Sequence, residues 1–142
     1  MNAMSQPMGN RHESRASALK ILYAQDIKNE LNLLTPESLQ IIASETLEKI
    51  DHFAQEIIIG ITNNIKEIDM VISKTSAHWK IERMSVVDRN ILRIGIWELM
   101  QKQSPAIIIN EAILLASEFG SENSTSFVNG ILDNIKKNFP LN

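Results

Sequence analysis

Apolar residues recur along the chain at intervals of three and four, the spacing that places side chains on one face of an α-helix. The clearest run consists of isoleucines at steps of four, four, three and four, namely Ile57, Ile61, Ile65, Ile68 and Ile72. We predict one helix across this run, with Asp51 as its N-terminal cap. The apolar triplet at 57–59 could form a strand in isolation, but the pattern on both sides of it is helical.

Capping residues and a proline divide the first part of the chain into two further helices. An amphipathic helix is expected from Arg11 to about Glu30. A second helix is expected from Pro36 to about Lys49, because Thr35 can cap it and proline is tolerated at the first helical position.

Capping residues, a proline and a glycine also divide the second part of the chain into helices. Residues 73–85 break the period and are predicted to be a connection with one helical turn. Ser85 is expected to cap a helix that is apolar on two sides, which is typical of the buried centre of a fold. The next helix opens with Ser104 and Pro105 and ends at Gly120, for which we expect the left-handed conformation.

A last helix is predicted with Asn123 or Ser124 as its N-terminal cap. Gly130 lies inside it, and close packing against a neighbouring helix would explain a glycine at that position. Isoleucine and leucine are abundant while glycine and proline are few, which favours long packed helices over many short strands. We therefore predict an all-α protein in which residues 1–10 are a disordered tail and residues 11–142 form a single helical domain.

Composition excludes several classes of function. The 142 residues carry 14 basic and 17 acidic side chains, and this net charge of −3 is too negative for a protein that coats nucleic acid by charge alone. The absence of cysteine excludes disulfides, thiolate metal sites and cysteine nucleophiles. Neither a signal peptide nor a membrane-spanning stretch is visible, so a cytoplasmic setting is expected.

Enzyme chemistry has little support in the sequence. The three histidines, His12, His52 and His78, lie on separate segments without the spacing of a metal site. The five glycines are isolated, so there is no phosphate-binding loop, and the Gly-x-Ser-x-Gly motif of hydrolases is missing. We predict no catalytic residues, no metal and no cofactor.

Charge is distributed unevenly along the chain. In the first 25 residues Arg11, Arg15 and Lys20 are opposed only by Glu13, whereas residues 26–78 carry four lysines against nine acids. The basic segment is therefore the part of this acidic chain that is best suited to contact phosphate groups.

Four side chains near the N-terminus suit single-stranded RNA. On a helix Arg11 and Arg15 project from one face, with His12 beside them and Tyr23 two turns beyond Arg15. Guanidinium groups bind phosphates and an aromatic ring can stack on an unpaired base. On composition alone, however, a solvated polar first turn is the preferred interpretation, because two arginines are a weak signal.

Four segments together resemble the bacterial transcription antitermination factor NusB family. They are RxxxRxxALKILYAQD at 11–26, VDRNILRIGIWEL at 87–99, IINEAILLASEFG at 108–120 and SFVNGILD at 126–133. The last three follow one another in the family's own order and spacing. The resemblance covers nearly the whole chain after residue 10.

The resemblance implies a NusB-like fold of about seven helices, in two three-helix sub-bundles that share a central helix, and no catalysis. It also implies partners. Members of the family pair with NusE, a small-subunit ribosomal protein, and the pair binds the boxA element of nascent RNA. The complex then acts with RNA polymerase and other Nus factors to promote ribosomal RNA transcription.

The resemblance also assigns roles to particular residues. The positions that match the family's RNA-binding residues are Arg11, His12, Arg15, Tyr23, Asn123 and Phe127. The positions that match its NusE-facing residues are Tyr23, Glu82 and Asp88. Three of these residues have a structural alternative: Phe127 can serve the core or cap its helix, Tyr23 can be half-buried, and Asp88 can simply favour the positive end of a helix.

The chain departs from the family at its basic segment. Where the family often has a cluster of arginines, this chain has Arg11 and Arg15, and Glu13 subtracts charge. Fewer phosphate contacts weaken binding and reduce its salt dependence. We therefore expect poor RNA binding by the protein alone and a gain in affinity through NusE.

Two alternatives remain open. One is a helical adaptor or self-associating module that contacts only proteins. The other is an accessory domain like that of some ribosomal-RNA cytosine methyltransferases, although 142 residues leave no room for a cofactor-binding domain. A homodimer is compatible with the sequence, which does not determine the oligomeric state.

Overall fold

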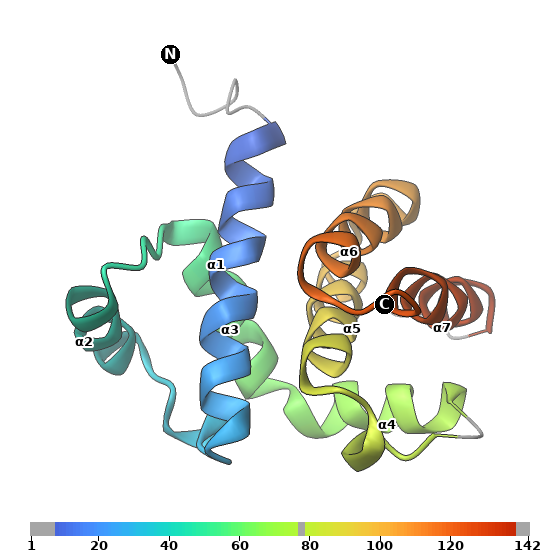
Figure 1. Cartoon of the computed structure of the whole chain (residues 1–142), viewed down its shortest axis with the longest axis horizontal. Helices are drawn as coiled ribbons and strands as arrows, with labels where there is room; N and C mark the ends of the chain where they lie inside the picture. Colours follow the sequence, from blue (N-terminus) through green and yellow to red (C-terminus); the bar gives the residue numbers. More distant parts are fainter. Residues whose placement is uncertain (1–7, 77–78, 139–142) are drawn as a thin grey trace. The chain divides into compact units, whose positions relative to one another are not determined.

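The computed structural model describes residues 8–76 and 79–138, with side chains from Arg11 onward. Within these ranges the regular structure is entirely helical, with seven α-helices and two short 3₁₀ turns (Figure 1). The all-α prediction is therefore confirmed. The first helix begins at Met8, three residues before the predicted start at Arg11, and residues 1–7 of the predicted tail lie outside the described part of the chain.

The chain divides into two compact units, Met1–Thr62 and Asn63–Asn142. The grouping of residues 11–142 into one domain stays a prediction, as does the sharing of a central helix by two sub-bundles. The first unit holds α1 (Met8–Ile27), η2 (Leu31–Leu33), α2 (Pro36–Thr46) and nearly all of α3 (His52–Asn63). Its buried side chains recur at helical spacing and include Leu19, Leu22, Leu39, Ile57, Ile58 and Ile61.

Local hydrogen bonds explain where α2 begins and ends. The Ser38 amide donates to the Thr35 hydroxyl at 3.0 Å, and the Ser38 hydroxyl accepts from the Thr35 amide at 2.9 Å, so the predicted cap forms a reciprocal capping box. The helix ends at Thr46, before the predicted Lys49. Leu47 follows in the left-handed conformation, with φ 61°, and its side chain is 91% exposed.

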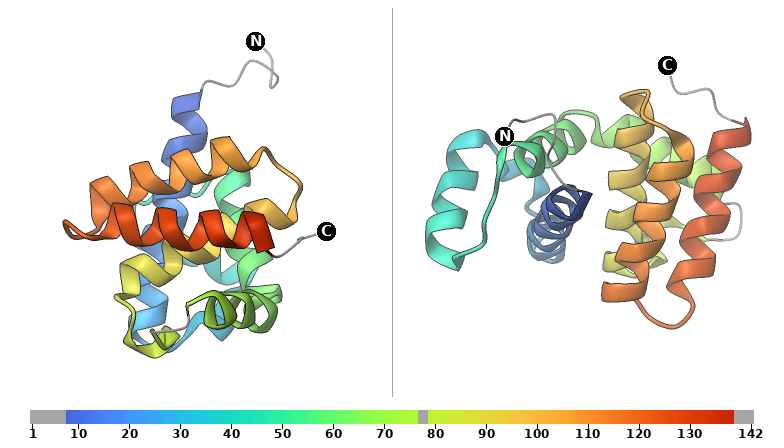
Figure 2. Two further views of the ribbon diagram at one scale, coloured as in Figure 1. Left: turned by 90° about the vertical axis from the view of Figure 1, so that its right-hand side faces the viewer. Right: turned by 90° about the horizontal axis from the view of Figure 1, so that it is seen from above.

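The second unit holds the remaining helices. They are α4 (Ile65–Thr75), η3 (Ile81–Arg83), α5 (Val86–Met100), α6 (Pro105–Phe119) and α7 (Ser124–Asn138). Helix α5 contacts α4, α6 and α7, and most of its residues are buried, as its two apolar faces predict. Helices α6 and α7 lie side by side (Figure 2). The Ser85 hydroxyl caps α5 by accepting from the Asp88 amide at 3.0 Å, which confirms the predicted cap.

The single helix predicted across the isoleucine run is wrong. Helix α3 ends at Asn63 and α4 begins at Ile65, because Asn64 leaves the helical conformation with φ −123° and ψ 22°. The Asn64 carbonyl accepts from the Ile68 amide at 2.9 Å and so opens α4. Asparagine is a poor helix former, and the apolar spacing keeps its phase across the break, so periodicity alone conceals it.

Two expectations about glycines are also wrong. Gly120 ends α6 in an extended conformation, with φ −94° and ψ −170°. A Cβ there would collide with the Ser124 side chain and would lie 2.8 Å from the Ala116 carbonyl oxygen, so close approach is what requires glycine. A Cβ at Gly130 would meet no atom within 4 Å, so this glycine is not closely packed. Gly95 is the closely packed glycine, because a Cβ at that position would lie 3.0 Å from Leu132 Cδ1.

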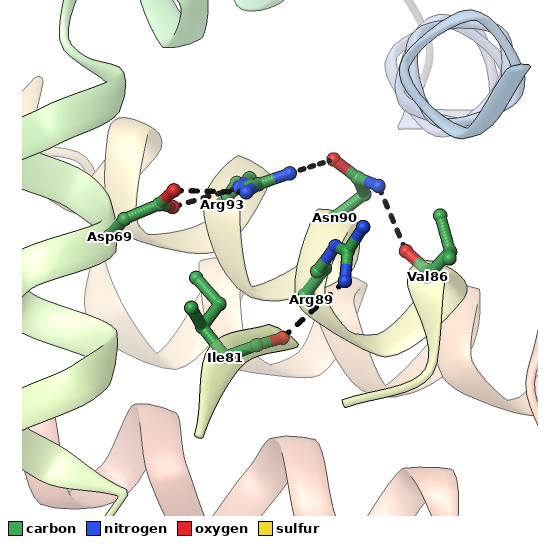
Figure 3. Close-up of polar contacts among 6 residues, drawn as sticks. All are labelled: Asp69, Ile81, Val86, Arg89, Asn90 and Arg93. Carbon is green, nitrogen blue, oxygen red and sulfur yellow. Dashed lines mark hydrogen bonds and ion pairs between the residues drawn. The ribbon is translucent and has the colours of Figure 1, made fainter. Parts of the chain in front are cut away.

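A polar network ties α4 to α5 (Figure 3). Arg93 is 6% exposed at its side chain and donates through Nε and Nη2 to both carboxylate oxygens of Asp69, each at 2.9 Å. Its third guanidinium nitrogen donates to Asn90 Oδ1 at 3.0 Å, and Asn90 Nδ2 donates to the Val86 carbonyl at 2.8 Å. Because each polar atom in this chain of contacts has a partner, the buried charge is compensated.

Candidate functional site

The basic residues of α1 are organised around one aromatic ring in the first unit. The Arg11 guanidinium lies 4.1 Å from the centroid of the Phe53 ring, and the Arg15 guanidinium lies 5.4 Å from it. Both distances allow cation–π attraction. Arg11 is exposed, whereas Arg15 is only 6% exposed. The structure therefore brings the two predicted arginines together, but presents them differently to solvent.

Phe53 is held in place by the start of α3. Asp51 caps this helix through Oδ1, which accepts from the Ala54 amide at 2.9 Å, so the predicted cap is confirmed. Through Oδ2 the same carboxylate accepts from the Ser14 hydroxyl at 2.5 Å. One turn along α1, the Ser17 hydroxyl donates to Glu48 Oε2 at 2.8 Å. Two serines thus fix the segment before α3 against α1.

A polar hollow of about 510 Å³ lies along these contacts. Its lining includes Ser14, Ser17, Lys20, Glu48, Lys49 and Asp51. The carboxylates in it already accept hydrogen bonds from the serines, and Lys20 Nζ lies 3.9 Å from Glu48 Oε1. We therefore infer that the residues of this hollow serve to attach residues 48–51 to α1.

The other predicted residues of the first unit lie on the same helix. His12 is half-exposed beside Arg11. Tyr23 is 40% exposed, so part of its ring is accessible to a ligand while the rest is packed. This agrees with both interpretations of Tyr23, a contact residue and a half-buried one.

In the second unit, Asn123 and Phe127 lie together at the start of α7. The Asn123 carbonyl accepts from the Phe127 amide at 3.1 Å and from the Ser126 hydroxyl at 3.2 Å. The Asn123 side chain is exposed, and Phe127 is half-buried. Ser124 is buried and its hydroxyl accepts from the Ser121 amide at 2.9 Å, which fixes the turn before α7.

The two acidic candidates of this unit differ in their environments. Glu82 is exposed on η3. Asp88 is 9% exposed, on the first turn of α5, and its Oδ1 is buried with no hydrogen-bond partner among the described residues. A buried carboxylate oxygen without a donor is unfavourable, so a donor supplied from outside would be stabilising there.

Sequence reasoning missed Phe53, Asp69 and Arg93. Phe53 is 38 and 42 positions away from the two arginines, and no spacing rule relates them. Arg93 lies inside the apolar run of α5, where a charged residue is unusual, and this was a signal that a buried partner exists. Nothing in the sequence identified Asp69 as that partner.

The described part of the chain offers neither a metal-binding cluster nor a helix suited to crossing a membrane. The described residues contain no group of three or more histidine, cysteine, aspartate or glutamate side chains that could hold a metal ion. His78 lies outside the described residues. Among the described helices, none has both the length and the apolar character needed to cross a membrane.

Comparison with known sequences identifies relatives over nearly the whole chain. Residues 12–137 match the sequence model of the NusB family. The transcription antitermination protein NusB of Halothermothrix orenii is 37% identical over 124 residues, which cover 86% of this chain and 92% of the relative. The NusB protein of Geobacter sp. (strain M21) is 40% identical over 138 residues, which cover 90% and 94%.

Solved structures of NusB proteins also match this chain. NusB of T. maritima matches with a TM-score of 0.75 and 36% identity, covering 94% of this chain and 92% of that one. A structure described as antitermination factors NusB and NusE in complex with double-stranded RNA matches with a TM-score of 0.76 and 28% identity, covering 94% and 100%. The helices, their order and these likenesses lead to one conclusion: the chain belongs to the NusB family of non-enzymatic transcription antitermination factors.

Proposed function

We propose that this NusB-family protein pairs with NusE and binds boxA-type single-stranded RNA, and that the pair acts in the cytoplasm with RNA polymerase and other Nus factors to promote ribosomal RNA transcription. The observation that carries the proposal is the placement of Arg11, an exposed guanidinium supported by the Phe53 ring. The solved NusB–NusE complex with RNA supports the choice of partners.

In the first unit, Arg11 is the direct phosphate contact. Its exposed guanidinium can donate several hydrogen bonds, while the Phe53 ring limits its motion and lowers the entropy lost on binding. Arg15 contributes positive charge from a buried position, so it reaches a phosphate only if its side chain moves. His12 and Tyr23 extend this contact along α1, the first by hydrogen bonding and the second by stacking.

In the second unit, Asn123 and Phe127 form a separate RNA contact. The exposed Asn123 amide suits the edge of a base, and the half-exposed Phe127 ring suits a base face. The buried Ser124 and the turn before α7 hold both residues in position.

NusE binds through Tyr23, Glu82 and Asp88. Asp88 supplies the strongest argument, because its buried Oδ1 has no donor among the described residues and a basic ribosomal protein can provide one. Glu82 is exposed and adds charge complementarity, which affects the association rate more than the affinity.

The test is a titration of labelled boxA RNA with the protein, with and without NusE, over a range of salt concentrations. We expect weak binding alone and much tighter binding with NusE. Arg11→Ala should weaken binding and reduce the salt slope by about 0.7, the value for one phosphate contact on a single strand. Lys28→Ala, which removes an exposed cation just after α1, is the matched control and should change neither the RNA affinity nor the salt slope.

Three results would contradict the proposal. Equal affinity with and without NusE would remove the cooperative role, and equal affinity of the Arg11→Ala variant would remove the proposed phosphate contact. Preference for a double-stranded RNA of the same sequence would contradict recognition of an unpaired strand. Binding of NusE without any binding of RNA would instead support the adaptor alternative.

A further inference from the structure

The second unit carries an exposed aromatic side chain that the proposed contacts do not use. Trp79 is 55% exposed, although tryptophan is among the most apolar side chains by area. It lies at a hollow of about 380 Å³ whose lining includes Ser73, Ser76, Lys80, Glu82 and Arg83. A large indole exposed beside a hollow is a candidate ligand contact.

Two hydrogen bonds join the main chain of Trp79 to Ser76, which follows the last residue of α4. The Ser76 hydroxyl donates to the Trp79 carbonyl at 2.7 Å, and the Trp79 amide donates to the Ser76 carbonyl at 3.3 Å. Ser76 itself is 8% exposed. Next along the chain, Arg89 donates to the Ile81 carbonyl at 3.4 Å, so η3 is tied to α5 (Figure 3).

The charge of the hollow suits an anionic ligand. Lys80 and Arg83 are both exposed and are opposed within the lining by one carboxylate, Glu82. Lys74, exposed on the last turn of α4, adds a further positive charge nearby in the sequence. In a chain with a net charge of −3, this segment is a second basic region besides the start of α1.

We propose that Trp79, Lys80 and Arg83 form a further contact for single-stranded RNA, with the indole stacking on a base and the two cations binding flanking phosphates. This inference rests on the proposed RNA-binding function and adds a site to it. An aromatic platform with neighbouring cations is the usual arrangement for unpaired strands. Glu82, a proposed NusE contact, belongs to the same lining, so this RNA contact would border the NusE surface; RNA is the preferred ligand for Trp79 itself because both neighbouring cations, Lys80 and Arg83, are exposed.

Indole fluorescence tests the contact directly. The chain has two tryptophans, so Trp97→Phe leaves Trp79 as the only indole. Titration of this variant with an unstructured oligouridylate should quench its emission to saturation, because a stacked base quenches indole. Trp79→Leu in the otherwise native chain should weaken RNA binding by about fivefold or more, the lower end for one base–aromatic stack, and Trp79→Phe should retain most of the affinity.

Matched variants separate the contributions. Lys80→Ala with Arg83→Ala should reduce the salt slope by about 1.4, for two phosphate contacts. Lys136→Ala with Lys137→Ala removes two exposed cations from α7 of the same unit and should leave the slope unchanged. Met70→Ala removes another exposed apolar side chain, on α4, and should leave the affinity unchanged.

Several outcomes would overturn this contact and leave the proposed function intact. One is RNA binding that is sensitive to Arg11→Ala while Trp79 emission stays constant and Trp79→Leu binds like the native protein. Another is a Trp79→Leu variant that loses NusE binding but keeps its RNA affinity, which would make the surface a protein contact. If Trp97→Phe fails to fold, the difference in quenching between the native chain and Trp79→Phe decides the same question.

Discussion

The Arg11 guanidinium lies 4.1 Å from the centroid of the Phe53 ring, so a residue of α3 supports the exposed arginine of α1. Phe53→Leu removes the ring's negative face but keeps an apolar side chain. We expect it to weaken RNA binding two- to fivefold, which corresponds to about 0.5–1 kcal/mol for an exposed cation–π pair. The measurement is the same RNA titration, with NusE present.

Phe53→Tyr is the control, since a phenol ring keeps the cation–π attraction. Thermal unfolding of both variants shows whether any loss comes from destabilisation of the first unit. The supporting role of Phe53 would be refuted if the Phe53→Leu and Phe53→Tyr variants bound RNA equally well.

The Arg93–Asp69 pair should contribute strongly to the stability of the second unit. Asp69→Ala removes the carboxylate to which the Arg93 guanidinium, 6% exposed at its side chain, donates two hydrogen bonds. We expect a loss of about 2–4 kcal/mol in the free energy of unfolding, measured by urea denaturation. Asp133→Ala removes an exposed carboxylate that pairs with Lys136 and Lys137, and it should change stability little. Similar losses in both variants would contradict the argument from burial.

Gly120 and Gly130 give a matched pair of substitutions. Gly120→Ala places a methyl group against Ser124 and should destabilise the protein by about 1–3 kcal/mol, as overpacking does. Gly130→Ala meets no atom within 4 Å inside α7 and should stabilise it by about 1 kcal/mol through helix propensity. Melting temperatures that move in the same direction would show that close approach is not what requires Gly120.

A pH-dependent interaction is expected at the end of α7. A hydrogen bond from Lys137 lowers the pKa of the Asp133 carboxyl below its usual value, with further help from the nearby charges of Lys137 and Lys136. A lowered pKa in the folded state means that the interaction is present above the unfolded-state pKa and is lost as the pH falls through the folded-state value. Lys137→Met should therefore raise the Asp133 pKa, followed by carboxyl carbon chemical shifts in an NMR titration, whereas Lys136→Met should raise it less.

Features that depend on neighbouring residues were predictable from the sequence. Thr35, Asp51 and Ser85 cap their helices because an N-cap needs only an oxygen within three residues of a backbone amide. The two-sided apolar pattern of α5 likewise identified a buried helix. The family resemblance supplied the remaining identification through four motifs, no one of which was sufficient.

Features that depend on distant residues or on a local break within a helical pattern were not predictable. The break at Asn64 is hidden because the isoleucine spacing continues through it. The burial of Arg15 depends on the packing of α1, and its exposure cannot be inferred from its spacing to Arg11. The Phe53 contact joins two helices that α2 separates in the sequence, so it appears only when the fold is known.

Leu47 marks a position at which a substitution could make this protein more heat-resistant. Its left-handed backbone is a conformation that glycine adopts without penalty, and its exposed side chain contributes nothing to the core. Natural chains commonly keep such residues because selection demands only enough stability for function. Position 47 is thus a place from which an engineer could compensate for costly substitutions elsewhere in the first unit.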